Sequence, residues 1–182
     1  EGIKLSRILA LNQDLSLALA AHPIRIEAPI PGKSLVGVEI PNKVGSIVRL
    51  GSLLVYPEFK TSSNLNFPLG RDVGGEPMFV DLSKMPHLLI AGATGSGKSV
   101  AIHAFILSLL YKNSPETLRL MMIDPKRVEL SVYEGIPHLI TPVITEGKRA
   151  VGALKFVIQE MEQRYETLLK AGRRDIISYN KG

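Results

Sequence analysis

The sequence has 182 residues and a formal net charge of +5, from 22 lysines and arginines against 17 aspartates and glutamates. The absence of cysteine excludes a disulfide framework and a zinc site built from thiolates, and no apolar run reaches the roughly 18 residues of a membrane-spanning helix. We therefore expect a soluble segment without membrane contact. Its basic residues are interspersed with acidic ones, so charge alone does not decide whether it binds nucleic acid.

Residues 1–66 predict a small α+β subdomain. Asn12 is expected to cap a short helix that runs to residue 20. Two apolar segments, 24–30 and 35–40, flank a Pro-Gly-Lys-Ser turn in the manner of a hairpin, and residues 46–55 predict one more strand. Prolines and polar residues between 56 and 66 indicate a connector, so we place the domain boundary after residue 66.

Residues 67–182 predict an α/β domain with a mainly parallel sheet. The expected order is a hairpin (67–71 with 77–82), strand 87–91, helix 98–112, strand 118–123, a helical turn near 127–133 and a long helix over 146–171. Alternating strands and helices are typical of parallel sheets with helical crossovers.

The long helix carries an apolar stripe that we predict to be buried in the core, and Gly172 is expected to end it. The stripe consists of Val151, Leu154, Val157, Ile158, Met161, Tyr165 and Leu168. The four histidines are dispersed and lack metal-ligand spacing, so we assign them structural roles.

Residues 92–99 read Gly-Ala-Thr-Gly-Ser-Gly-Lys-Ser and match the whole phosphate-binding pattern G-x-x-x-x-G-K-[ST]. An apolar segment precedes the loop and a helical pattern follows it, as this pattern requires. A triphosphate carries several negative charges, so its binding loop must bring many N–H donors close without intervening side chains. The octet therefore predicts a nucleoside triphosphate site.

The residue types assign a role to each position of this loop. Gly92, Gly95 and Gly97 provide bare backbone, Lys98 reaches the β- and γ-phosphates as the candidate catalytic residue, and Ser99 is placed to ligate Mg²⁺. The full predicted nucleotide-binding set is Gly92, Ala93, Thr94, Gly95, Ser96, Gly97, Lys98, Ser99 and Val100.

Several segments together resemble the FtsK/SpoIIIE family of double-stranded DNA translocases. The resemblance lies in residues 85–91 leading into the loop, in Met-Ile-Asp-Pro-Lys at 122–126 and in the block 129–139, which ends in Ile-Pro-His-Leu. Shorter matches at 31–34, 39–42, 160–165 and 179–180 extend it over nearly the whole chain.

The resemblance implies a RecA-like motor with an additional strand. Such motors form a homo-oligomeric ring, usually a hexamer, that uses ATP and Mg²⁺ to pull double-stranded DNA during chromosome segregation at cell division or sporulation. Residues 1–66 would be the family's α subdomain and residues 67–182 its β subdomain, incomplete at the C-terminal end. The implied location is the cytoplasmic face of the bacterial cell membrane.

Asp124 ends an apolar segment, as does the acidic residue that holds Mg²⁺ in many phosphate-loop proteins. It is a candidate metal residue, and the alternative is that it shapes the turn with Pro125. Lys126 and Glu129 are expected at the same rim, where strand ends face a ligand. They would contact ATP or a neighbouring subunit, and the equal alternative is a local ion pair.

The family's apolar run followed by Asp-Glu-Phe-Ala-Asp, whose Asp-Glu pair positions metal and water, is not found in this sequence. We therefore expect a fragment that binds ATP with little turnover. The main alternative is a related ring ATPase that moves protein in a secretion system. A small-molecule kinase is disfavoured by the extra N-terminal module, and a nucleotide-gated assembly module is the non-enzymatic alternative.

Overall fold

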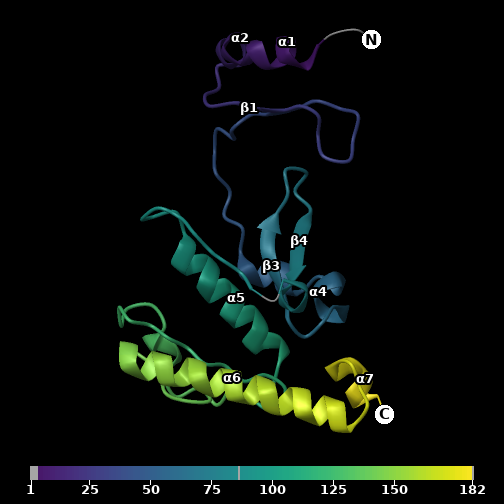
Figure 1. Ribbon diagram of the computed structural model, residues 1–182. Helices are drawn as coiled ribbons and strands as arrows, with labels where there is room; N and C mark the ends of the chain where they lie inside the picture. Colours follow the sequence, from purple (N-terminus) through teal and green to yellow (C-terminus); the bar gives the residue numbers. More distant parts are fainter. Residues whose placement is uncertain (1–3, 86, 182) are drawn as a thin grey trace. The chain divides into compact units, whose positions relative to one another are not determined.

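The computed structural model describes residues 4–85 and 87–181 (Figure 1). Its contacts divide the chain into two compact units, Glu1–Ile47 and Val48–Gly182. The predicted boundary after residue 66 falls inside the second unit, because two short helices before it pack on the strand that contains residue 66. The assignment of the family's subdomains to residues 1–66 and 67–182 stays a prediction.

The first unit contains two short helices and a hairpin. The helices are α1 (Leu5–Ala10) and α2 (Asn12–Ala18), and the strands β1 (Arg25–Glu27) and β2 (Gly37–Glu39) pair antiparallel with Ile26 opposite Val38. The predicted hairpin is confirmed, with shorter strands. Leu11, not Asn12, is the N-cap of α2, and the Asn12 side chain instead donates to the Ile24 carbonyl at 3.4 Å.

The second unit begins with α3 (Leu50–Leu54) and α4 (Pro57–Thr61). The prediction of a strand over 46–55 is wrong. Leu50, Leu53 and Leu54 have the i, i+3, i+4 spacing of a helix, and the last two are buried. Pro57 occupies the first turn of α4, where its missing N–H costs nothing, and Phe59 is 1% exposed.

A second hairpin follows, as predicted, from β3 (Asn66–Arg71) and β4 (Pro77–Asp81), and the 3₁₀ turn η1 (Leu82–Lys84) ends it. The helix α5 (Lys98–Lys112) packs on β3, and the rings of Phe67 and Phe105 lie 4.2 Å apart between centroids. The predicted bounds of this helix are confirmed.

The C-terminal end of α5 is fastened to the segment after α4. Lys112 Nζ donates to the carbonyl oxygens of Phe59 at 2.6 Å and Ser62 at 2.7 Å, and Asn113 Nδ2 donates to the Asn64 carbonyl at 2.8 Å. Burial lowers the pKa of Lys112, and the charge of Asp81 opposes that shift. The end of the helix is therefore held by polar bonds as well as by apolar packing.

The predicted parallel sheet is reduced, within residues 87–181, to two parallel bridges that join Leu120 to Leu139 and Ile123 to Ile144. The N–H of Leu120 donates to the His138 carbonyl at 2.8 Å, and the N–H of Ile144 donates to the Met122 carbonyl at 2.9 Å. Residues 87–91, predicted as a strand, form no regular element, and Leu89 is 91% exposed. An apolar segment becomes a strand only where another backbone pairs with it.

The turn η2 (Ser131–Tyr133) and two helices, α6 (Gly147–Lys170) and α7 (Ile176–Asn180), complete the described chain. After α6, the N–H of Gly172 donates to the Leu169 carbonyl and that of Arg173 to the Leu168 carbonyl, which is a Schellman motif. The helix therefore ends at Gly172 as expected, with Ala171 as the C-cap residue and Gly172 one position beyond it. None of the described helices is long and apolar enough to cross a lipid bilayer.

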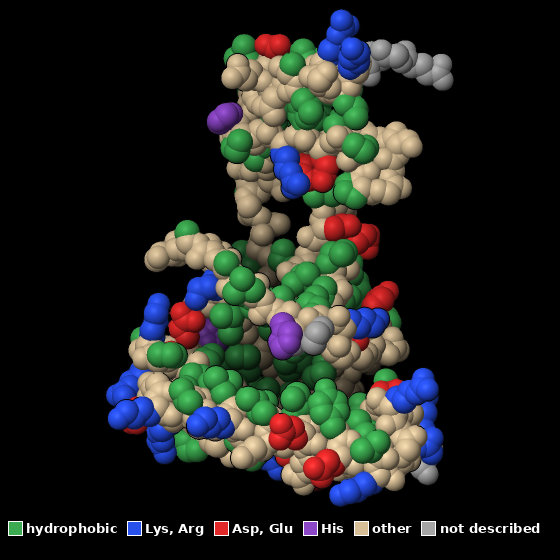
Figure 2. Space-filling model, in the orientation of Figure 1, with side chains coloured by type: hydrophobic (Ala, Val, Ile, Leu, Met, Phe, Trp, Pro, Cys, Tyr) green, Lys and Arg blue, Asp and Glu red, His purple; other side chains and the backbone are tan. Residues whose placement is uncertain are grey.

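The prediction that the α6 stripe is core is wrong for this structure. Among the described residues of α6 only Ala153 is buried, and Figure 2 shows hydrophobic side chains gathered along this helix. The exposed members are Val151, Leu154, Val157, Ile158, Met161 and Tyr165, all at least 46% exposed. Helical spacing identifies the apolar side of a helix, but burial also needs a second surface, and few described residues pack along α6.

Candidate nucleotide-binding site

The phosphate-loop octet runs directly into α5, as predicted. Gly97 is the N-cap of this helix with φ 89° and ψ 9°, a left-handed conformation that L side chains rarely adopt. Lys98 is the first helical residue, and the Ala101 N–H donates to the Gly97 carbonyl at 2.9 Å to open the helix. The loop is therefore followed directly by a helix of 15 residues. At the N-terminus of this helix, free N–H groups and the helix dipole favour an anion.

The loop closes on itself at Gly92. A Cβ at this position would overlap the hydroxyl oxygen of Ser96, so a larger residue would displace the Ser96 side chain. The N–H of Ser96 donates to the Ala93 carbonyl at 3.1 Å. Residues 92–97 are exposed, while Lys98 and Ser99 are half-buried, so the backbone of the loop is open to a ligand.

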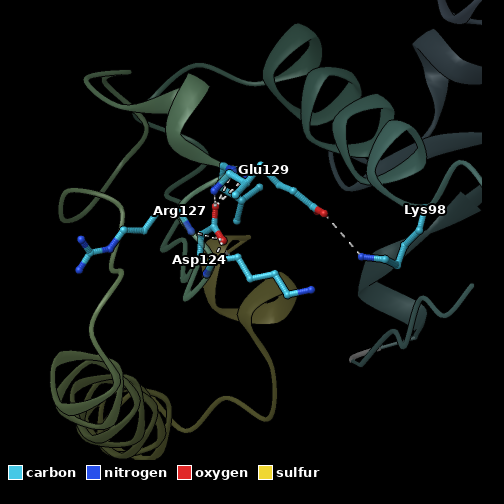
Figure 3. Close-up of polar contacts among 7 residues, drawn as sticks. Lys98, Asp124, Arg127 and Glu129 are labelled. Carbon is cyan, nitrogen blue, oxygen red and sulfur yellow. Dashed lines mark hydrogen bonds and ion pairs between the residues drawn. The ribbon is translucent and has the colours of Figure 1, made fainter. Parts of the chain in front are cut away.

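Lys98 forms an ion pair with Glu129. Its Nζ lies 3.8 Å from Oε1 of Glu129, and the two side chains are 35% and 31% exposed (Figure 3). Of the three roles considered for Glu129, the described structure has the local ion pair. The contact brings a residue 31 positions along the chain to the phosphate-binding lysine, which no local sequence pattern could locate.

Asp124 is 6% exposed and is the centre of a tight turn (Figure 3). Its Oδ1 accepts from the backbone N–H groups of Lys126 and Arg127, each at 3.1 Å. Its Oδ2 accepts from the next three N–H groups, those of Val128, Glu129 and Leu130, at 2.9–3.0 Å. Two carboxylate oxygens thus hold five successive amides.

These hydrogen bonds explain why the Asp124 carboxylate is ionised and why the backbone of the turn curves around it. The Leu130 amide is the largest influence lowering the pKa of Asp124, burial opposes it, and the other amides add to it, so the group is an anion at neutral pH. Arg127 has a positive φ of 59°, unusual for a residue other than glycine, which lets the chain wrap around the carboxylate. An aspartate before a proline is a recognised turn signal in a sequence. It does not predict that the Asp124 carboxylate accepts five backbone hydrogen bonds.

The two predicted metal residues differ in what they can offer a cation. Ser99 lies in the first turn of α5, directly after Lys98, and the pattern predicts its hydroxyl as a ligand of Mg²⁺. Both oxygens of Asp124 are engaged by backbone amides, and this geometry favours the turn-shaping alternative. No cluster of three or more histidines or carboxylates suited to a metal occurs within residues 4–85 and 87–181.

Two histidines take part in structural hydrogen bonds, in line with the sequence prediction. His103 Nδ1 on α5 lies 2.8 Å from the hydroxyl of Tyr133 in η2, and Tyr133 is 5% exposed. His138 is buried, and its Nε2 lies 3.0 Å from the Asn113 carbonyl. These contacts connect α5 to the segment that follows the Asp124 turn.

Loop and helix together define an α/β protein with a phosphate-binding loop. The FtsK/SpoIIIE family model matches residues 53–182, and the FtsK alpha domain model matches residues 1–42. The chain belongs to the FtsK/SpoIIIE family, and the resemblance noted in its sequence is confirmed.

Curated relatives named DNA translocase FtsK are similar over nearly the whole chain. The protein of Halalkalibacterium halodurans is 58% identical over 181 residues, which cover 99% of this chain and 23% of that protein. A Helicobacter pylori relative is 54% identical over 99% of this chain and 21% of its own length. The chain therefore spans about a quarter of the length of these relatives.

Two solved structures share the fold. The pCW3 conjugation coupling protein TcpA, in its monomer form with ATPγS, has a TM-score of 0.60 at 24% identity and covers 98% of this chain and 48% of its own. The cytoplasmic domain of the Type VII secretion ATPase EccC from Thermomonospora curvata has a TM-score of 0.58 at 28% identity, over 75% of this chain and 19% of its own.

Proposed function

We propose that this chain is the ATP-binding part of a ring-forming motor that uses ATP hydrolysis to translocate double-stranded DNA in chromosome segregation, cell division or sporulation. One observation carries the proposal: an open glycine-rich loop enters α5 so that Lys98 and Ser99 occupy its first turn. The relatives at 53–58% identity, all named DNA translocases, support DNA as the substrate of the whole protein.

In this proposal residues 92–100 surround the polyphosphate. Backbone N–H groups of the loop donate to phosphate oxygens, and Lys98 supplies a compact cation to the β- and γ-phosphates. Mg²⁺, when bound, neutralises phosphate charge, and the Ser99 hydroxyl is the group of this chain that fits it. Asp124 acts on the site indirectly, because its oxygens are bound to the turn at 126–130.

The chain alone is proposed to bind ATP with little turnover. Phosphoryl transfer needs alignment, charge neutralisation and an oriented water. The loop supplies the first two, and the Asp-Glu segment that would orient water is not part of this sequence. We propose that in the whole protein the nucleotide lies between subunits of a homo-oligomeric ring, a hexamer, at the cytoplasmic face of the cell membrane.

The finer fold assignment is also a proposal. The parallel bridges at 120–123 and 139–144 support a RecA-like, mainly parallel sheet as the framework of the complete ATPase domain. We further propose that the chain has two subdomains. In support, the two family models match separate ranges, 1–42 and 53–182, with residues 43–52 between them.

Binding is tested by calorimetry and thermal unfolding with ATPγS and Mg²⁺. A ligand that binds only the folded state raises its melting temperature, and a concentration of 100 times Kd adds about 2.7 kcal/mol. We expect this rise in the unaltered chain, its loss in Lys98→Ala and its retention in Lys148→Ala on α6. An unchanged rise in Lys98→Ala would place ATP elsewhere.

The secretion ATPase alternative has one observation in its favour, the fold shared with EccC. A DNA-stimulated ATPase assay on the whole protein separates the two functions. Duplex DNA should increase turnover, and contacts to phosphates make the effect fall steeply with salt. ATP turnover that does not change with DNA and increases with a secreted protein substrate would favour the secretion ATPase.

A further inference from the structure

Glu129 lies opposite the phosphate loop because a buried carboxylate fixes its backbone. The N–H groups of Glu129 and Leu130 donate to Oδ2 of Asp124 at 2.9 and 3.0 Å. Asp124 is itself fixed, since its own N–H donates to the Ile144 carbonyl at 2.8 Å in the parallel bridge. The Glu129 side chain therefore extends from an anchored point of the chain.

A second contact holds this turn near the helix that carries Lys98. Tyr133, four residues beyond Glu129, is buried, and its hydroxyl lies 2.8 Å from Nδ1 of His103 on α5. Lys98 is the first residue of that same helix. Both partners of the Lys98–Glu129 ion pair thus belong to elements that are joined by an independent hydrogen bond.

The turn directs the carboxylate of Glu129 at Lys98. Figure 3 shows the Glu129 carboxylate directed at Lys98, while the Arg127 side chain points away from it. The Glu129 carboxylate lies 3.8 Å from Nζ of Lys98 and so pairs with the ammonium group that a triphosphate needs. It would also lie close to the phosphates once they arrive, and like charges repel.

We propose that Glu129 is a resident counter-anion of Lys98 that competes with the triphosphate and thereby lowers the affinity of the site for ATP. Asp124 is the positioning residue of this device. The inference rests on the proposed binding of ATP at residues 92–100, and it assigns to that site an internal competitor. Nucleotide enters by taking Lys98 from Glu129, so the ion pair exists in the empty site and is broken in the filled one.

The size of the effect follows from the exposure of the pair. Partly exposed ion pairs change equilibria by a small factor, up to about fivefold, because water screens them. Removing the carboxylate relieves both the competition for Lys98 and the repulsion of the phosphates. We therefore expect removal of the Glu129 charge to tighten ATP binding about three- to tenfold at low salt.

The test is calorimetric titration of the chain with ATPγS and Mg²⁺, comparing the unaltered protein with Glu129→Gln. The matched control is Glu160→Gln, which removes the same charge from an ion pair with Arg164 on α6. Glu129→Gln should lower Kd about three- to tenfold near 0.05 M salt, and the difference should shrink below about twofold at 0.5 M, where charges are screened. The control should stay within about 1.5-fold of the unaltered chain.

Equal or weaker binding by a folded Glu129→Gln variant would overturn the inference, since a merely structural contact gives no gain in affinity. Should that variant fail to fold, Glu129→Asp keeps the charge on a shorter side chain and is expected to give a smaller gain; no gain there overturns the inference as well. Absence of binding by the unaltered chain would instead refute the proposed function.

Discussion

Truncation of Phe67 tests how the second unit holds α5 in place. Phe67 is 1% exposed, pairs with Val80 across the β3–β4 hairpin and packs against Phe105 with ring centroids 4.2 Å apart. Phe→Ala in a core costs about 3–5 kcal/mol, of which an aromatic pair accounts for about 0.5–1.5 kcal/mol. Since domains are stable by about 5–15 kcal/mol, Phe67→Ala should remove a large part of the free energy of unfolding.

Urea unfolding followed by far-UV circular dichroism measures this loss. With a denaturant slope of about 2 kcal/mol/M, a cost of 4 kcal/mol lowers the midpoint by about 2 M. Leu69→Ala is the matched control, because Leu69 lies on the same strand and is 57% exposed, and it should cost less than about 1 kcal/mol. Equal midpoints for the two variants would refute the packing argument. A double-mutant cycle with Phe105→Ala should give a coupling of about 0.5–1.5 kcal/mol.

Three further predictions concern polar and backbone features. Hydrogen bonds, first that of the Leu130 amide, lower the pKa of Asp124 from 3.8, so its stabilising effect is complete above about pH 4 and is lost as pH falls through the lowered value. Asp124→Asn should therefore lower the urea midpoint at pH 7 much more than at pH 2, and equal shifts would contradict this. Lys112→Met removes the ammonium that donates to the Phe59 and Ser62 carbonyls, of which the first keeps the Ser62 hydroxyl as a donor, and should cost about 1–3 kcal/mol in the same unfolding assay, whereas Lys148→Met should be neutral. Gly97→Ala forces a side chain into left-handed backbone and should cost about 1–2 kcal/mol while weakening ATPγS binding in calorimetry; unchanged affinity and stability would argue against the loop geometry.

Local patterns predicted the parts of the fold that local chemistry determines. The phosphate loop, the bounds of α5, both hairpins and the Gly172 termination could be located because glycines, prolines and apolar spacing act over a few residues. The strand predicted over 46–55 failed because the apolar run Leu50, Leu53, Leu54 also satisfies helical spacing. Short apolar runs leave this ambiguity open.

Features that depend on distant partners were not predictable. Burial of the α6 stripe and strand structure at 87–91 both need a second surface, and the described residues provide little for either. In the site, the loop could be recognised residue by residue, but the Lys98–Glu129 pair and the five amides around Asp124 depend on a tertiary turn. A sequence shows which groups are present and not which of them meet.

The hydrogen bonds at the C-terminal end of α5 also restrict the orientation of the whole helix. Fifteen residues of α-helix span about 22 Å, with the phosphate loop at one end and Lys112 and Asn113 tied to residues 59–64 at the other. With the far end tied, a tilt of the helix by about 5° would displace the loop end by roughly 2 Å. The bonds of Lys112 and Asn113 to residues 59–64 therefore limit where the N-terminus of α5, and with it the phosphate loop, can lie.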